Sequence, residues 1–389
     1  MDQEKGKEEK RHVSWLELFY DLVYAAAIAQ LGQNLSHDLS IQGFVEYVVL
    51  FVIVCWAWTG ATFYATRFDV DDLVHRILVL LQMAGAVSLA VNSNQAFDGT
   101  SMGFIISYVA IRSFLILEYI RTGKKITEAR PLTSKYGIGF SCTTFLWLVS
   151  LFIPEPLRFI VWILAVIIDI IVTIFITRKY VNLPPNAFHL SQRMGLFVII
   201  VLGETIFGLV FNLSPLEWSI PTVLGMGTGI TIAFGLWWIY FDTVDGSAVR
   251  ALKENNRIGI YLSWLYLHFP LLIGIAAMGD GIAHVIKADQ NLSIPFSELW
   301  LICGSVSLCL FSMGFLHLVT FEANSSRKVG LKWLFYRFIS AFIVIMIAVL
   351  GVKVLPITLL LTISIVCIIQ VIIDLRYHPH HRIFKIGMD

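Results

Sequence analysis

The chain has 389 residues, of which 57% are hydrophobic and only 14% are charged, and its formal net charge at pH 7 is +1. So few charged residues cannot cover the surface of a water-soluble protein of this length. The balanced charge argues against nucleic acid as a partner, because no basic face can form. Composition therefore predicts a protein whose main partner is the lipid bilayer.

Apolar segments recur along the whole chain, and each is close to the ~20 residues that a helix needs to cross hydrocarbon. The first twelve residues carry charges of both signs and predict a short cytoplasmic tail rather than a cleavable signal peptide. Twelve segments follow, at 14–36, 43–66, 74–93, 101–120, 136–153, 157–177, 189–211, 219–241, 257–284, 298–320, 331–350 and 354–375. We expect an all-α, polytopic integral membrane protein with about twelve transmembrane helices.

Positive charge predicts which side of the membrane each connection faces. When both termini are placed in the cytoplasm, the cytoplasmic tails and loops hold all but five of the 28 Lys and Arg residues. Arg112 and Arg337 fall inside segments, and Arg158, Lys287 and Lys353 lie in the opposite loops. This asymmetry is the positive-inside pattern. We therefore expect a multi-pass protein with both termini in the cytoplasm.

Similar residues six segments apart suggest that the chain has two halves. The sixth and twelfth segments both contain Ile-Ile-Asp, ending on Asp169 and Asp374, and the second and eighth end in aromatic clusters followed by acidic residues. An offset of six helices would give two parallel repeats, as in transporters built of two bundles. Chance is the alternative, because aromatic and acidic residues recur at any membrane boundary. The expected division is a tail at 1–13, six-helix bundles at 14–180 and 181–377, and a tail at 378–389.

Ionisable residues inside the apolar segments are the candidate functional residues, because a charge at the bilayer centre costs ~2.5–3.5 kcal/mol and normally faces protein or a water-filled cavity. Glu17 and Asp21 are four residues apart, so they share one helix face with Tyr20 and Tyr24 beside them. Two ionised carboxylates this close repel each other unless a cation lies nearby. Arg112 has a similar predicted depth, and a buried ion pair with Asp21 or Glu204 is one interpretation. A purely structural counter-ion, and a Glu17 that reaches outward to water, are the alternatives.

Glu204 and His268 are expected near the middle of the membrane. Pro270 removes a backbone hydrogen bond beside His268 and is expected to kink or loosen that helix, which is one way to build a membrane site. We expect Glu204 and His268 to converge on a shared wet pocket. The alternative is a satisfied structural hydrogen bond within the bundle. Asp169 and Asp242 are secondary candidates, and a boundary acid such as Asp242 can equally cap a helix at headgroup level.

No metal, cofactor or catalytic site is predicted. The five cysteines lie inside apolar segments without a Cys-x-x-Cys pair, which is typical of small packing residues. The histidines at 378, 380 and 381 are expected to belong to a frayed terminus rather than a metal site. Because no His-x-x-x-Asp, His-Glu-x-x-His or Gly-x-Ser-x-Gly motif lies at a plausible depth, we do not expect an enzyme.

The chain resembles the bacterial low temperature requirement A family over most of its length. Four runs carry the resemblance, in this order: W-L-E-L-F-Y-D-L-V-Y from Trp15, R-M-G-L-F-V-I-I-V-L-G-E-T-I from Arg193, L-W-W-I-Y-F-D from Leu236 and Y-L-H-F-P-L-L-I-G-I from Tyr266. The family often has an acidic residue before the arginine of the second run, where this chain has Gln192. The resemblance implies a polytopic protein of the bacterial inner membrane linked to growth in the cold, without a substrate or reaction.

Two functions fit these features. The first is secondary transport of a small solute or ion, with proton coupling through Glu204 and His268 and a cytoplasmic half-path lined by Glu17, Asp21 and Arg112. The alternative is a non-transporting sensor or scaffold that supports growth in the cold, in which buried polar groups set helix packing and bilayer thickness acts as the signal. A lipid-modifying enzyme ranks last because no catalytic motif is present. The substrate, coupling ion, direction and oligomeric state stay open.

Overall fold

The computed structural model describes residues 11–97, 101–180, 185–213, 218–243, 257–323 and 327–377, and within them helices are the only regular elements. The first six α-helices are α1 (Trp15–His37), α2 (Ile41–Arg67), α3 (Leu73–Val91), α4 (Met102–Lys125), α5 (Arg130–Ser150) and α6 (Leu157–Lys179). The next six are α7 (Ala187–Leu213), α8 (Ile220–Thr243), α10 (Ile258–Lys287), α11 (Phe296–Ala323), α12 (Arg327–Val349) and α13 (Pro356–Tyr377). The all-α, polytopic fold expected from the sequence is confirmed.

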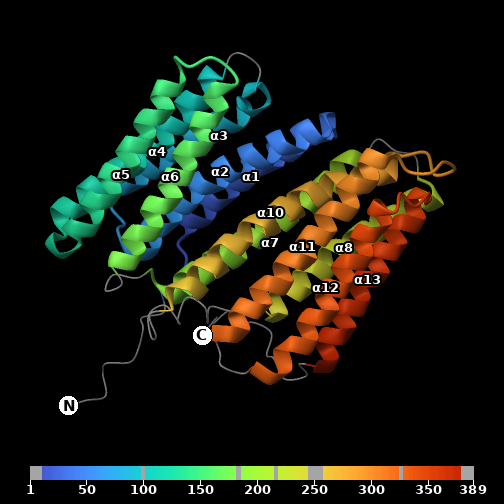
Figure 1. Ribbon diagram of the computed structural model, residues 1–389. Helices are drawn as coiled ribbons and strands as arrows, with labels where there is room; N and C mark the ends of the chain where they lie inside the picture. Colours follow the sequence, from blue (N-terminus) through green and yellow to red (C-terminus); the bar gives the residue numbers. More distant parts are fainter. Residues whose placement is uncertain are drawn as a thin grey trace.

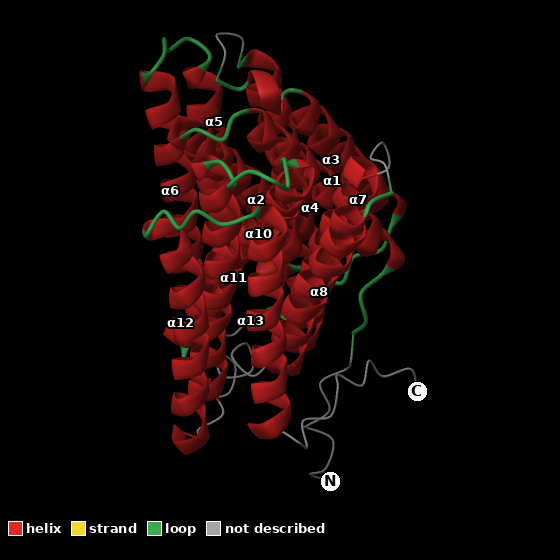
Figure 2. Ribbon diagram, turned by 90° about the vertical axis from the view of Figure 1, so that its right-hand side faces the viewer, coloured by secondary structure: helices red, strands yellow, loops and turns green. Residues whose placement is uncertain are grey.

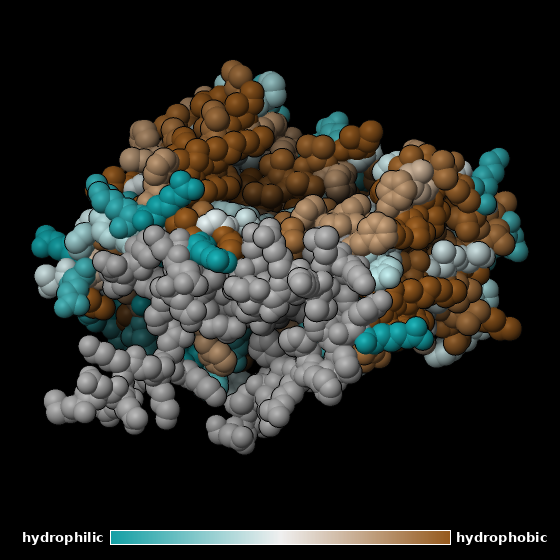
Figure 3. Space-filling view, turned by 60° about the horizontal axis from the view of Figure 1, so that its bottom comes forward, coloured by the Kyte–Doolittle hydropathy of each residue, from teal (hydrophilic) through white to brown (hydrophobic). Residues whose placement is uncertain are grey.

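The helices have the length and surface of membrane-spanning elements. Nine of the described helices are long and apolar enough to cross a bilayer. The other three, α1, α5 and α12, are not among these nine and lie beside them (Figure 1). The axes of the helices are broadly aligned with one another (Figure 2). Hydrophobic side chains cover much of the outer surface seen in Figure 3, and exposed examples include Leu80, Phe145 and Phe175. Such a surface suits contact with acyl chains rather than water.

Caps show why two helices begin where they do. Ser14 caps α1 in a capping box, in which its hydroxyl accepts from the Glu17 amide at 3.3 Å and Glu17 Oε2 accepts from the Ser14 amide at 2.8 Å. Asp72 caps α3 by accepting from the His75 amide at 3.0 Å. Asp72 also pairs with Arg121 and with Lys125, and the Lys125 ammonium and the His75 amide hold the Asp72 pKa well below its usual range.

Helix contacts in the two halves follow one pattern. In the first half α1 packs on α2 and α3, and contacts then run from α3 to α4, α4 to α5 and α5 to α6. In the second half α7 packs on α8 and α10, and contacts run from α10 to α11, α11 to α12 and α12 to α13. Figure 1 shows these as two groups of helices that lie side by side. The bounds of the two bundles at 14–180 and 181–377 stay a prediction.

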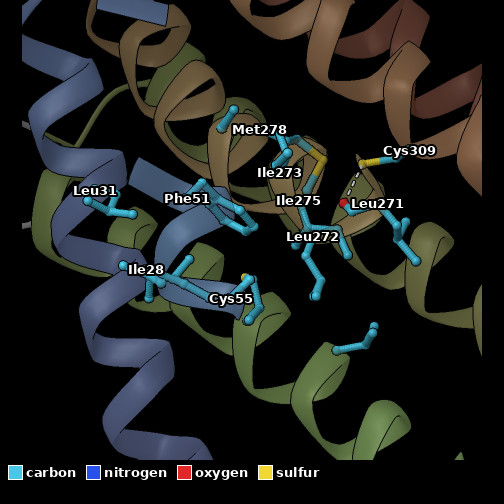
Figure 4. Packing of buried hydrophobic residues seen from close by; sticks show 14 of the residues in the cluster. Ile28, Leu31, Phe51, Cys55, Leu271, Leu272, Ile273, Ile275, Met278 and Cys309 are labelled. Atoms are coloured by element: carbon cyan, nitrogen blue, oxygen red, sulfur yellow. Dashed lines mark hydrogen bonds between the residues drawn. The ribbon is translucent and has the colours of Figure 1, made fainter. Parts of the chain in front are cut away.

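The two groups meet along α1, α2, α7 and α10, where the described core is continuous. Figure 4 shows Ile28 and Leu31 of α1 and Phe51 of α2 facing the α10 residues around Ile273. Gly32 leaves room for the Asp280 carboxylate of α10, since a Cβ at Gly32 would lie 2.3 Å from one of its oxygens. The apolar interior is therefore shared across the boundary between the groups.

Candidate functional site

The carboxylates of α1 meet basic side chains of α7 at the boundary between the two helix groups. Glu17 Oε2 lies 3.2 Å from His189 Nε2, and Glu17 Oε1 lies 3.8 Å from an Nη of Arg193. Asp21, which is fully buried, pairs with Arg193 and accepts a hydrogen bond from Trp58 Nε1 at 2.7 Å. Both predicted acids of α1 thus share one guanidinium. We call Glu17, Asp21, His189 and Arg193 the inter-bundle cluster.

The positive side of this cluster was missed at the sequence level. In the charge pattern Arg193 counts as a cation of a cytoplasmic loop, and His189 is only the first residue of an apolar segment. Neither position therefore indicates a buried site. A usable signal exists, because His189 and Arg193 are four residues apart and therefore project from one face of α7, as Glu17 and Asp21 do from α1. Two matched pairs at the same predicted end of the membrane would have indicated a contact between these helices.

A small cavity, lined by both apolar and polar side chains, lies next to the inter-bundle cluster. It has a volume of about 20 Å³ and is enclosed by side chains of α1, α2, α3, α4 and α7. Its polar lining comprises Glu17, Tyr20, Tyr64, His75, Gln82, Glu118 and Arg193. This volume holds one or two water molecules, and the lining offers enough hydrogen-bonding groups to keep them. The cavity opens among helix ends that the positive-inside pattern assigns to the cytoplasm.

Hydrogen bonds connect the cavity residues into a chain. His75 Nδ1 lies 2.6 Å from Glu118 Oε1, and Gln82 donates from its amide to Glu118 Oε2 at 3.0 Å. The Tyr20 hydroxyl donates to the Gln82 carbonyl oxygen at 3.2 Å and lies 3.2 Å from the Tyr24 hydroxyl. Sequence reasoning selected both tyrosines but neither His75 nor Glu118. Those two lie near helix ends, where a charged residue needs no explanation until its burial is seen.

Arg112 pairs with neither Asp21 nor Glu204. Its Nη2 lies 2.7 Å from Asp169 Oδ2, and both side chains are 1% exposed. Asp169 also accepts from Thr143 at 2.6 Å and from Trp56 at 3.2 Å. The pair thus lies inside the first helix group, so the interpretation of an ion pair between Arg112 and Asp21 or Glu204 is wrong. Asp21 finds its cation on α7 instead.

His268 is a satisfied structural residue. Its Nδ1 lies 2.7 Å from the Trp264 carbonyl oxygen and so donates to it, and its Nε2 then accepts from the Tyr240 hydroxyl at 2.9 Å. Both ring nitrogens of a neutral imidazole are therefore occupied in a fully buried position. Pro270 lies within α10, which runs without interruption from Ile258 to Lys287. The helix therefore continues past Pro270, and the kink expected beside His268 stays a prediction.

Glu204 lies away from His268. Its neighbour Thr205 donates to the Ile275 carbonyl oxygen at 3.4 Å and packs beside Gly279. Those α10 positions are two to three turns beyond His268, which is a distance of about 10 Å or more along the axis. Glu204 is half-buried and has no hydrogen bond or ion pair to another described residue. The expected convergence of Glu204 and His268 on one wet pocket is therefore wrong.

A second buried ion pair occupies the second helix group. Arg337 Nη2 lies 3.1 Å from Asp374 Oδ2, and both residues are buried. Asp242 interacts electrostatically with Asp374. Asp169 and Asp374, which carry the Ile-Ile-Asp similarity, thus both pair with a buried arginine. Within the described ranges, no group of three or more His, Cys, Asp and Glu residues could hold a metal ion.

Comparison with known proteins decides the family. The family described as bacterial low temperature requirement A protein (LtrA) matches residues 12–372. The chain belongs to this family. A relative from Rhizobium meliloti (strain 1021), named "Uncharacterized protein RA0937", is 27% identical over 330 residues, which cover 80% of this chain and 76% of that protein. The family resemblance seen in the four sequence runs is confirmed, and the inter-bundle cluster draws on two of those runs, at Trp15 and Arg193.

Proposed function

We propose that this LtrA-family protein is a secondary transporter of a small solute or ion, in which the two helix groups move against each other. The observation that supports this function best is the inter-bundle cluster, because its acidic side chains come from one helix group and its basic side chains from the other. Transporters of two repeats place their polar sites at the repeat interface. Within the described residues, the pairs Arg112–Asp169 and Arg337–Asp374 stay inside one group each.

The cost of burying charges explains why this cluster could lie between two helix groups that move against each other. Removing two charges from water costs more than their attraction returns unless further hydrogen bonds satisfy both, so a buried pair is weak support for stability. Around Arg193, one guanidinium serves two carboxylates, and Glu17 Oε1 has no hydrogen bond in the described structure. Water entering through the adjacent cavity would solvate these groups when the helices separate. The cluster can therefore act as a cytoplasmic gate that closes in a dry state and opens in a wet one.

In this proposal, the arrangement described above is the closed state of the gate. A cavity of about 20 Å³ admits water but no organic solute. Entry of a solute from the cytoplasm thus requires α1 and α7 to move apart at the inter-bundle cluster. We place both termini and this gate on the cytoplasmic side of the inner membrane, on the basis of the Lys and Arg distribution. Reporter fusions at either terminus test that orientation.

Transport is tested with purified full-length protein in liposomes that contain a pH-sensitive dye and radiolabelled probes. The probes are amino acids, carboxylates, organic cations and sugars, each added under an imposed pH gradient. We expect uptake of at least one class above that of protein-free liposomes. His12 lies just before α1 and Phe188 lies in α7, and their ring centroids are 5.9 Å apart. Joining His12→Cys to Phe188→Cys with a disulfide-containing cross-linker should stop this uptake until a reductant cleaves the disulfide. Each single cysteine variant, in a background without native cysteines, is the control.

One observation favours the alternative of a non-transporting membrane sensor or scaffold. The midmembrane region around His268 is packed, and His268 forms the structural hydrogen bonds that a scaffold requires. In that case no probe class is taken up although the protein is folded, and the cross-linked protein supports growth in the cold as well as the reduced one. That pair of results would replace transport with the scaffold function.

A further inference from the structure

The cavity and the inter-bundle cluster together contain more carboxylates than guanidinium groups. Glu17, Asp21 and Glu118 supply three carboxylates, whereas Arg193 is the guanidinium in direct contact with the first two. Arg11 adds a second guanidinium 3.6 Å from Glu17, but it is shared with exposed Asp69 at 3.2 Å. Counted over carboxylates and guanidinium groups alone, this group has at least one excess negative charge in a buried place. Such a group binds a cation, and the cavity volume restricts that cation to a very small one.

We propose that the His75–Glu118 pair is the proton-binding site of this protein, loaded from the cytoplasm. The inference rests on the proposed transport function for its role, and it names the proton as the coupling ion. Glu118 is 1% exposed, and the His75 side chain beside it is 12% exposed. The histidine is thus the member of the pair that reaches water. Its ring nitrogen and the carboxylate oxygen are close enough to share one proton.

Loading moves one proton without any other reactant. A proton from cytoplasmic water adds to the free ring nitrogen of His75, and the proton on Nδ1 passes to Glu118 Oε1. The imidazole is then neutral again in its other tautomer, and Glu118 is a neutral carboxylic acid. One O–H bond breaks in the donor hydronium and one forms on Glu118. The cavity group then loses its excess negative charge.

The hydrogen-bond chain connects this site to the gate. Glu118 Oε2 accepts from Gln82, and Gln82 accepts from Tyr20 on α1, one turn from Glu17 and next to Asp21. Neutralising Glu118 changes the charge that faces Gln82 and also the field at Arg193 across the cavity. Proton loading therefore acts on α1, the helix that makes the inter-bundle cluster. The charged and titratable groups that share the cavity with Glu118 are Glu17 and Tyr20 of α1, Tyr64 of α2, His75 of α3 and Arg193 of α7.

His189 is the competing proton acceptor, since its Nε2 faces Glu17 and its Nδ1 has no hydrogen-bond partner in the described structure. It is completely buried, however, and the chain of hydrogen bonds from the cavity mouth leads to Glu118 instead. A carboxyl and an imidazole give different infrared signals on protonation. The two sites can therefore be separated by experiment.

The test is infrared difference spectroscopy of the full-length protein in nanodiscs between neutral and acidic pH. We expect a protonated-carboxyl band in the wild type that Glu118→Gln removes and Glu298→Gln keeps. Glu298 is the matched control, because it faces His284 at 3.9 Å near the opposite helix ends. An unchanged band in Glu118→Gln, or loss of proton uptake in His189→Gln alone, overturns the inference.

A kinetic variant covers the case in which Glu118→Gln does not fold. His75→Gln keeps the acid but removes the relay, so a pH jump should load the carboxyl about a hundredfold more slowly. An unchanged loading rate overturns the proposed route. Neither measurement requires transport. If Glu118 is protonated but no probe is taken up, the proton site is supported and the transport function is refuted. If a probe is taken up but Glu118 is not protonated, transport is supported and the proton site is refuted.

Discussion

The ion pairs inside the helix groups and the inter-bundle cluster between them use the same side chains in different ways. Arg112 and Asp169 form a direct pair in which the acid also accepts from Thr143 and Trp56, and the guanidinium lies 3.9 Å from the centroid of the Phe140 ring. Arg193 instead faces two acids beside a cavity large enough for water. The difference shows that burial of a charged side chain does not by itself indicate a functional site. What distinguishes the inter-bundle cluster is the adjacent cavity, through which water could reach its charged groups.

The within-group pair should show the largest stability effect. Asp169→Ala leaves the Arg112 charge buried and unpaired, so we expect a loss of about 3–5 kcal/mol in the free energy of unfolding, measured by denaturant titration in detergent micelles. Replacing both residues with leucine should recover most of that loss, because no lone charge remains. A single variant as stable as the wild type would contradict the structural role of this pair.

Arg193→Ala should affect the boundary between the groups more than the groups themselves. Loss of its charged hydrogen bonds is expected to lower stability by about 1.5–3 kcal/mol, less than in Asp169→Ala because His189 and Trp58 still contact the two acids. Spin labels on Trp15→Cys and Ile199→Cys should report a longer and broader α1–α7 distance distribution. An unchanged distribution would mean that Arg193 does not hold the boundary closed.

Tyr240→Phe sharpens the comparison at midmembrane. It leaves His268 Nε2 without its donor, so we expect a stability loss of about 1–3 kcal/mol. Probe uptake and carboxyl loading should both be unchanged in the folded variant. If Tyr240→Phe is as stable as the wild type but no longer transports, His268 has a functional role after all.

Glu204→Gln should have a smaller effect still. Glu204 is half-buried and has no partner among the described residues, so removal of its charge should change stability by no more than about 0.5 kcal/mol. Thermal unfolding in detergent measures this. A large loss would reveal a partner for Glu204 and would weaken the contrast with the inter-bundle cluster.

The smallest effect is expected at Asp72, outside the membrane-spanning segments. Asp72→Asn keeps the α3 cap but loses the ion pairs with Arg121 and Lys125. Because the folded-state pKa of Asp72 is lowered, its stabilisation is present above the unfolded-state pKa of about 4 and disappears as pH falls through the folded value. The variant should therefore be slightly less stable at neutral pH and equal to the wild type in strong acid. A difference that persists in acid would point to the cap rather than the charge.

Sequence reasoning located half of the inter-bundle cluster. Glu17 and Asp21 stand out because acids are expensive within an apolar helix, and Tyr20 and Tyr24 share their face. Glu118 and His75 could not be selected in the same way, because their positions near helix ends allow contact with water. Glu204 and His268 were selected correctly as costly residues but paired wrongly, since similar depth says nothing about which helices are neighbours.

The order of the residues alone determined that this is an all-α membrane protein of the LtrA family, because hydrophobic length and the four family runs are local properties of the chain. Which charges meet was decided by tertiary structure. Asp21 binds Arg193 instead of Arg112 because α1 packs against α7, and no periodicity within either helix specifies its neighbour. The cavity depends on the same packing, as five helices from both groups must come together to enclose it.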